Sequence, residues 1–189
     1  MQRHKLIGYL LLAVVLLAAL VACRDRKAAT KGNFETAIND YYKGHQECMV
    51  FFPNVQLSGS QVLADAGLLT KTTQTEKAFW GGMTTSTKYE ISPEGQKYHD
   101  AHGRLCYGRA EVAEIVNFTE PGDMMGQKVS RVMVKYRIVD LAPWAKLDSV
   151  QKTFPEIKKA AAAESSPLQR EMVLVLMNDG WSVPNQEGF

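Results

Sequence analysis

The chain begins with a block of apolar residues and then changes to patterns that are typical of a folded domain. Residues 7–22 are almost wholly apolar and follow the basic residues Arg3 and Lys5. A basic start followed by an apolar run is the layout of a secretory signal. The run is shorter than the ~20 residues that a membrane-spanning helix needs. We therefore expect residues 1–22 to be an export signal.

Helices and a hairpin are expected in the N-terminal half of the remaining chain. Phe34, Ile38, Tyr41 and Tyr42 recur at helical spacing, which predicts an amphipathic helix over residues 34–45. A short strand is predicted over residues 48–52. Ser60 is a candidate N-cap for a second helix that ends before Gly67.

The hairpin is expected directly after that second helix. Its first strand starts at Leu68 and Leu69, its turn lies at residues 80–82, and its second strand covers residues 87–91. Ser92 and the proline after it then favour a helix start, since the serine can cap and the proline lacks an N–H that would otherwise be unsatisfied.

The C-terminal half has the two-residue period of an antiparallel sheet. Strands are predicted over residues 111–118, 131–138 and 172–177, and a tight turn at residues 178–180 leads into a last strand at residues 181–183. One or two short helices are expected over residues 141–166. These elements predict one α+β domain over residues 34–189, in which a helical and hairpin N-terminal half precedes an antiparallel β-meander.

One local segment, residues 57–98, resembles part of a winged-helix domain. The residues that carry the resemblance are Asp65-Ala66-Gly67-Leu68-Leu69 and Tyr89-Glu90-Ile91-Ser92-Pro93-Glu94-Gly95. The segment before Ala66 is short and lacks a basic recognition face. The resemblance therefore implies a local shape, a helix followed by a hairpin, and not DNA binding.

The end of the apolar run, Leu20-Val21-Ala22-Cys23, resembles the lipobox of bacterial lipoproteins. The resemblance implies a diacylglycerol on the Cys23 sulfur, cleavage before Cys23, and a further acyl chain such as palmitate on the new amine. Residues 23–33 would then be a flexible tether. Arg24 stands where an aspartate favours retention in the inner membrane, so we expect the outer membrane, with the domain facing the periplasm.

The net charge of the expected mature chain argues against nucleic acid as a partner. The 22 Lys and Arg residues exceed the 20 Asp and Glu residues by two, and both Arg3 and Lys5 lie in the expected signal. The mature protein is therefore neutral and has no electrostatic footprint for nucleic acid.

Two cysteines, Cys48 and Cys106, remain once Cys23 is acylated. Two thiols in an exported chain most often pair, so we expect a disulfide between them. The competing interpretation is a metal site or a catalytic thiol, since His45 lies three residues before Cys48.

Candidate catalytic or metal-ligating residues are few. His99 and His102 lie three residues apart, a spacing that could hold a metal on a helix. The surrounding residues are polar and end in Gly103, which favours a helix end instead. The chain has no G-x-S-x-G or H-E-x-x-H motif and no phosphate-binding glycine loop. We expect no cofactor and no catalysis.

Other apolar residues favour packing over binding. Trp144 and Trp181 are expected in the core, and the link around Met124 and Met125 is expected to tuck onto its own sheet rather than serve as a contact surface. The prediction is a non-catalytic envelope lipoprotein that binds or supports a protein partner. The alternative is a periplasmic carrier of a small ligand or lipid, with an apolar cavity under the sheet.

Overall fold

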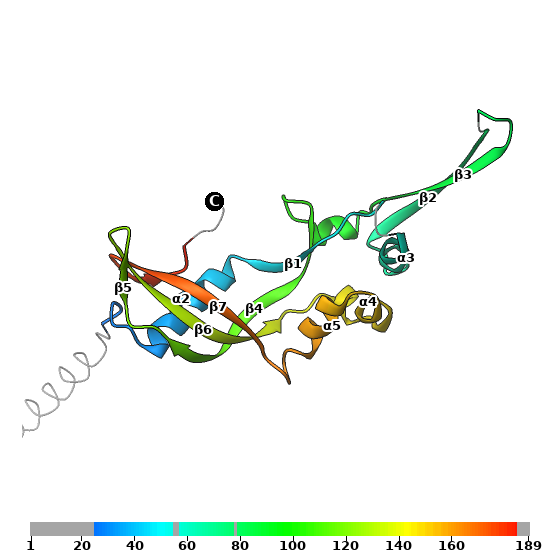
Figure 1. Cartoon of the computed structure of the whole chain (residues 1–189). Coiled ribbons are helices and arrows are strands. Elements are labelled where there is room, and N and C mark those ends of the chain that lie inside the picture. Colours follow the sequence, from blue (N-terminus) through cyan, green and yellow to red (C-terminus); the bar gives the residue numbers. More distant parts are fainter. Residues whose placement is uncertain (1–24, 55–56, 78, 185–189) are drawn as a thin grey trace, which may run out of the picture.

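The computed structural model describes residues 25–54, 57–77 and 79–184. Its main body is a six-stranded antiparallel sheet in the order β1-β4-β6-β7-β8, in which β5 also pairs with β6. The chain is therefore α+β, as the sequence predicts (Figure 1). The strands of this sheet are β1 (Gln46–Val50), β4 (Arg104–Phe118), β5 (Gly122–Met124), β6 (Gln127–Val139), β7 (Leu168–Met177) and β8 (Gly180–Ser182).

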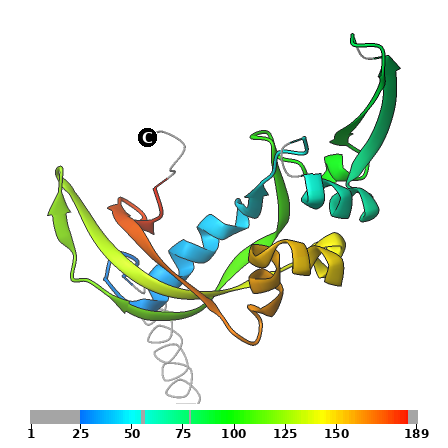
Figure 2. The ribbon, with the colours of Figure 1, turned by 45° about the vertical axis from the view of Figure 1, so that its right-hand side comes forward.

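Helix α2 (Lys31–Lys43) lies across the concave face of this sheet (Figure 2). The Tyr42 ring of α2 lies 6.4 Å from the Tyr136 ring of β6, a strand in which the even-numbered residues from Ser130 to Ile138 are buried and the odd-numbered ones are not. This is the period of two that the sequence shows. The buried residues of the two elements are Phe34, Ala37, Ile38, Tyr42, Ser130, Val132, Val134, Tyr136 and Ile138.

The start of α2 corrects the expected limit of the tether. The helix begins at Lys31 and not at Phe34, because the Thr30 side chain accepts the Asn33 N–H at its N-terminus. The indole of Trp181 donates to the Lys27 carbonyl at 3.1 Å. Residues 25–33 therefore include the first turn of α2 and a segment that is hydrogen-bonded to β8. Cys23 and the expected signal lie outside the described residues.

Three short helical segments connect β6 to β7, in the region where the sequence predicts one or two helices. They are η2 (Pro143–Lys146), α4 (Asp148–Thr153) and α5 (Pro155–Ala162). Pro155 stands in the first turn of α5, where its missing N–H leaves no bond unmade. The Phe154 ring contacts that of Phe51, with a centroid distance of 5.9 Å, and so joins these helices to the chain after β1.

A long excursion separates β1 from β4. It contains α3 (Leu57–Asp65), β2 (Leu69–Lys77), β3 (Met83–Ile91) and η1 (Gly95–Tyr98). Strands β2 and β3 pair only with each other among the described residues. The expected helix and hairpin are present, but a winged-helix domain is not confirmed, since the residues described between β1 and β4 form one α-helix, a two-stranded hairpin and a 3₁₀ helix.

Two further expectations about this region need correction. Ser60 does not cap α3, because the helix already begins at Leu57; its hydroxyl is buried and donates to the Pro53 carbonyl. The sheet also does not belong to the C-terminal half alone, because β1 forms its edge beside β4. Pairing between strands that are far apart in sequence is set by tertiary packing, which the local pattern does not report.

Candidate interaction site on the projecting hairpin

Strands β2 and β3 form an arm that projects away from the main sheet (Figure 1). Nine residue pairs hold it, from Leu69↔Ile91 at its base to Lys77↔Met83 near its turn. At ~3.3 Å per residue the paired part is about 30 Å long. Most of its side chains are exposed on both faces of the ribbon. We call β2, β3 and the turn Phe79–Gly82 the arm.

The base of the arm is fixed by polar side chains of the excursion. The Asn54 side chain accepts the Tyr89 N–H at 3.0 Å and donates to the Tyr89 carbonyl at 3.3 Å. Its amide thus pairs with the backbone of β3 as another strand would. The Gln61 amide oxygen on α3 accepts hydrogen bonds from Tyr89 Oη at 3.1 Å and from Lys71 Nζ at 2.7 Å.

The end of β3 is closed by Ser92 and Gly95. The Ser92 hydroxyl donates to the Gly67 carbonyl at 2.6 Å and accepts the Gly95 N–H at 2.9 Å. The expected helix start at Ser92 is confirmed only in part: its hydroxyl accepts the Gly95 N–H as a capping side chain does, but the helix that follows is the 3₁₀ helix η1, whose N-cap residue is Glu94. A β-carbon at Gly95 would lie 2.1 Å from the Leu68 carbonyl oxygen, so only glycine fits here. The arm is therefore held rigidly at its base on the α3 side.

The arm tip, which we define as Phe79, Trp80 and Met83, is apolar and exposed. Phe79 is 93% exposed, Trp80 90% and Met83 70%. The two rings contact each other edge to face, with centroids 5.1 Å apart. Large aromatic side chains normally contribute to stability by burial. Here they add nothing to the core, which makes the arm tip the candidate site of interaction.

The disulfide between Cys48 and Cys106 is present and confirms the sequence prediction. The two cysteines are register partners on β1 and β4, with Cα atoms 3.8 Å apart. The bridge therefore ties together the two strands from which the excursion leaves the sheet and to which it returns. It closes the chain segment that carries the arm.

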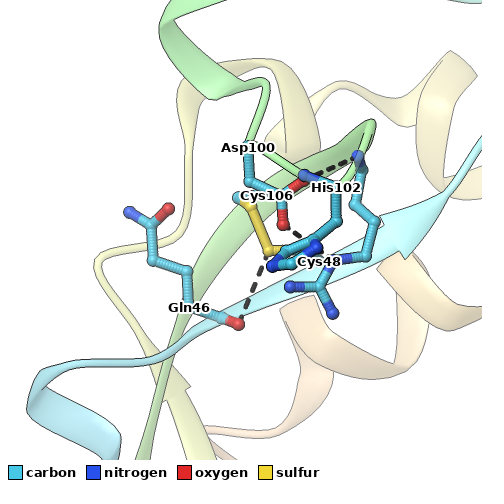
Figure 3. Close-up of a disulfide and its surroundings, with 6 residues drawn as sticks. Gln46, Cys48, Asp100, His102 and Cys106 are labelled. Atoms are coloured by element: carbon cyan, nitrogen blue, oxygen red, sulfur yellow. Dashed lines mark hydrogen bonds and ion pairs between the residues drawn. A yellow bond between two sulfur atoms is a disulfide. The ribbon is translucent and has the colours of Figure 1, made fainter. Parts of the chain in front are cut away.

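Asp100 lies beside this disulfide (Figure 3). Its carboxylate accepts the backbone N–H groups of His102 and Arg104 at 3.0 and 2.8 Å, and it accepts Arg104 Nε at 2.7 Å. Burial raises the pKa of this carboxyl, but the hydrogen bonds outweigh it and hold the pKa below its usual range. Asp100 thus organises the turn before β4.

The weak metal candidates His99 and His102 stand at this turn. Backbone pairing places His99 opposite Leu105 in a bridge, and the backbone of His102 bonds to Asp100. Among the described residues, the one group with metal-ligand spacing is Cys48, Asp100 and Cys106. Two of its three members share a disulfide and so have no thiolate to offer. His45 is elsewhere, with Nδ1 2.7 Å from the Tyr41 carbonyl oxygen.

A second cluster, around Arg170 on β7, lies near the C-terminal end of α2. The guanidinium is 2.9 Å from the Glu47 carboxylate and 4.0 Å from the centre of the Tyr136 ring. Burial lowers the pKa of Arg170, but Tyr136 and Glu47 raise it more, so the guanidinium stays charged. Burial, and then the Glu47 charge, raise the pKa of Tyr107 to about 12. Every charged member has a partner, so the cluster stabilises the fold without requiring a ligand.

An open groove of about 870 Å³ lies between α2 and β8. It is lined by both polar and apolar side chains, among them Tyr41, Asp40, Trp181 and Met177. It is not the apolar cavity under the sheet that the alternative function, a carrier of a small ligand or lipid, requires. On the face of the sheet that α2 covers, Phe34, Ile38 and Tyr42 are almost completely buried.

The sequence predicts that two tryptophans and a methionine-containing link pack onto the domain, and the structure confirms this only for the tryptophans. Trp144 and Trp181 are 4% and 7% exposed, which confirms them as core residues. The link with Met124 and Met125 is not tucked away; it forms β5 and a tight turn, and the two methionines are 53% and 101% exposed. Sequence reasoning did not single out Phe79 and Trp80 as a site. The available signal was a pair of large aromatic residues in a turn between two threonine-rich, polar strands.

The described residues contain no helix long and apolar enough to cross a membrane. Comparison of the chain with protein-family models, with curated proteins and with solved structures gives no match.

Proposed function

We propose that this chain is a non-catalytic lipoprotein of the cell envelope, anchored through Cys23 and facing the periplasm, and that it binds its partner with the arm. The single observation that carries the binding role is the exposure of Phe79 and Trp80 at the end of a rigidly based, polar hairpin. Exposed aromatic side chains of this kind are typical interaction residues.

Support for the lipid anchor comes from the residues Leu20-Val21-Ala22-Cys23 at the end of the apolar run. Arg24 in place of aspartate favours the outer membrane. Each buried methylene of an acyl chain contributes ~0.8 kcal/mol, so two or three chains hold a protein at a bilayer without other contacts. The carrier alternative has less support, because the sheet face under α2 is filled by side chains.

The anchor is tested by mass spectrometry of the mature protein from membranes. We expect an N-terminal Cys23 that carries two or three acyl chains. A Cys23→Ser chain should remain unprocessed or leave the membrane fraction. An unmodified cysteine, or a mature chain that starts elsewhere, would contradict the anchor.

The binding role is tested by photo-crosslinking in intact cells. A photoreactive residue at position 80 should form adducts, whereas one at position 125, the equally exposed turn between β5 and β6, should form few. Equal labelling at both positions would show that the arm has no special role.

A further inference from the structure

The exposed apolar side chains of the arm are confined to its end, since Leu69 and Tyr89 at its base are buried and Ile91 is partly buried against the core. Beyond the buried base residues Leu69 and Tyr89, the two strands expose polar side chains on both faces, seven of them threonines. A ribbon that packs along its length in an apolar groove of another protein would present an apolar stripe on one face. The arm has no such stripe, and its exposed apolar surface lies only at the turn that ends the hairpin.

The chemistry of this turn suits the boundary between lipid headgroups and acyl chains. Tryptophan is enriched at that boundary, since its ring is apolar and its N–H can still reach water. Lys77 pairs with Met83 at the turn, and lysine can extend its ammonium to anionic headgroups while its methylenes stay among the lipids. The turn Phe79–Gly82 itself has no carboxylate that would oppose insertion.

The position of the arm tip fits a second contact with a membrane. The described chain begins at Asp25, at the end of the molecule opposite to the arm (Figure 1). The Asp25 carbonyl accepts a hydrogen bond from the Asn33 side chain in α2, and the Lys27 carbonyl accepts one from the Trp181 indole in β8, so the start of the described chain is held against the domain. A bilayer that touches both ends would run along the length of the molecule.

From these three observations we infer that the arm tip inserts into the lipid bilayer, with Phe79, Trp80 and Met83 at the depth of the interface and Lys77 at the headgroups. The inference rests on the proposed function, in which the chain is already held at a membrane.

The test uses the mature chain from residue 23 with Cys23→Ser, so that no acyl chain contributes, and vesicles of phosphatidylethanolamine and phosphatidylglycerol. Trp80 is exposed, whereas Trp144 and Trp181 are buried. A blue shift of tryptophan fluorescence on vesicle addition therefore reports Trp80. Lipids brominated near the headgroup should quench this emission more than lipids brominated at the chain end.

Three variants make the measurement specific. Measured by cosedimentation with vesicles, which needs no tryptophan reporter, Trp80→Ala and Phe79→Ala should each lower the vesicle partition coefficient by roughly tenfold, the effect of removing a large aromatic side chain from an apolar environment. Met125→Ala, which truncates an equally exposed apolar residue at another turn, should leave it unchanged. Thermal unfolding should be the same for all, since none of these side chains is buried.

The inference is overturned if the Cys23→Ser chain does not bind vesicles, or if Trp80→Ala leaves its partition coefficient unchanged. It is also overturned if sedimentation shows self-association that Trp80→Ala abolishes, because the arm would then bind a second copy. If position 80 labels a protein rather than lipid in intact cells, the proposed binding role stands and the lipid inference fails. Missing acylation on Cys23 would instead remove the proposed anchor.

Discussion

Asp100 shows how one carboxylate organises the turn that leads into β4. It accepts two backbone N–H groups and the Arg104 side chain, and these bonds keep its pKa below the ordinary value of an aspartate. A carboxyl with a lowered folded pKa contributes stability above its unfolded pKa of about 4, and that contribution is lost as the pH falls through the folded pKa.

The Asp100→Asn variant should therefore have a lower free energy of unfolding than the native protein at pH 7. The deficit should shrink as the pH falls below about 4, where the native side chain also loses its charge. Urea unfolding of both proteins at pH 7 and near pH 3 measures this. Asp123→Asn, at an exposed ion pair with Lys128, is the control and should change little at either pH. A deficit that does not depend on pH would contradict the assignment.

Arg170 on β7, unlike Asp100, contacts residues of other strands: Glu47 on β1 and Tyr136 on β6. Arg170→Met would leave the Glu47 carboxylate, whose side chain is 20% exposed, without its cation and would remove the contact with the Tyr136 ring. We expect a loss of about 1–3 kcal/mol in the free energy of unfolding, because a half-buried charge loses its partner. The control is Lys43→Met, whose partner Asp40 is 61% exposed; it should cost less than about 0.5 kcal/mol.

Arg170→Met also separates a structural role from a binding role. If this variant keeps native stability but loses the cellular function of the protein, the cluster around Arg170 binds a ligand and our interpretation of it is wrong.

At the scale of elements, the disulfide and the arm base decide how firmly the excursion is held. Cys48 and Cys106 are separated by 58 residues in sequence. In the chain-entropy model a loop of this size corresponds to about 4 kcal/mol of stability. The Cys48→Ser/Cys106→Ser double variant should lose an amount of this order in urea unfolding. A midpoint equal to that of the native protein would contradict it.

The fit between Leu68, the residue before β2, and the 3₁₀ helix η1 after β3 gives a second prediction. Gly95→Ala should lower the free energy of unfolding by about 1–3 kcal/mol, because its β-carbon would overlap the Leu68 carbonyl and the backbone must shift. Gly82→Ala, where a β-carbon meets no atom within 4 Å, should stay within about 0.5 kcal/mol of the native value. Equal stability of the two variants would show that the arm base is loosely packed.

Most helices and strands could be predicted from the spacing of apolar residues along the chain. The alternation of Val132, Val134 and Tyr136 is local information, and the structure places these side chains on one face. The backbone pairing of β1 with β4 could not be predicted from periodicity, because the side-chain pattern of a short strand does not identify which distant strand it pairs with. The expected helix cap at Ser60 failed for a related reason: tertiary burial placed that serine inside α3.

At the scale of the whole molecule, the candidate site depends on exposure, which sequence pattern alone does not report. Phe79 and Trp80 follow a predicted strand, and a turn aromatic can as readily fold back onto a core. Only the projection of the arm from the sheet leaves them in solvent. The disulfide, by contrast, could be predicted from two spare cysteines in an exported chain.

The central claim is that the arm tip is covered by a partner in the cell. Hydroxyl-radical footprinting of the native chain, in intact cells and after purification, tests it without any substitution. We predict that oxidation of Phe79 and Trp80 falls severalfold in cells relative to the purified protein, while that of Met125, equally exposed at another turn, stays the same. Equal oxidation of Trp80 in the two samples would contradict the account.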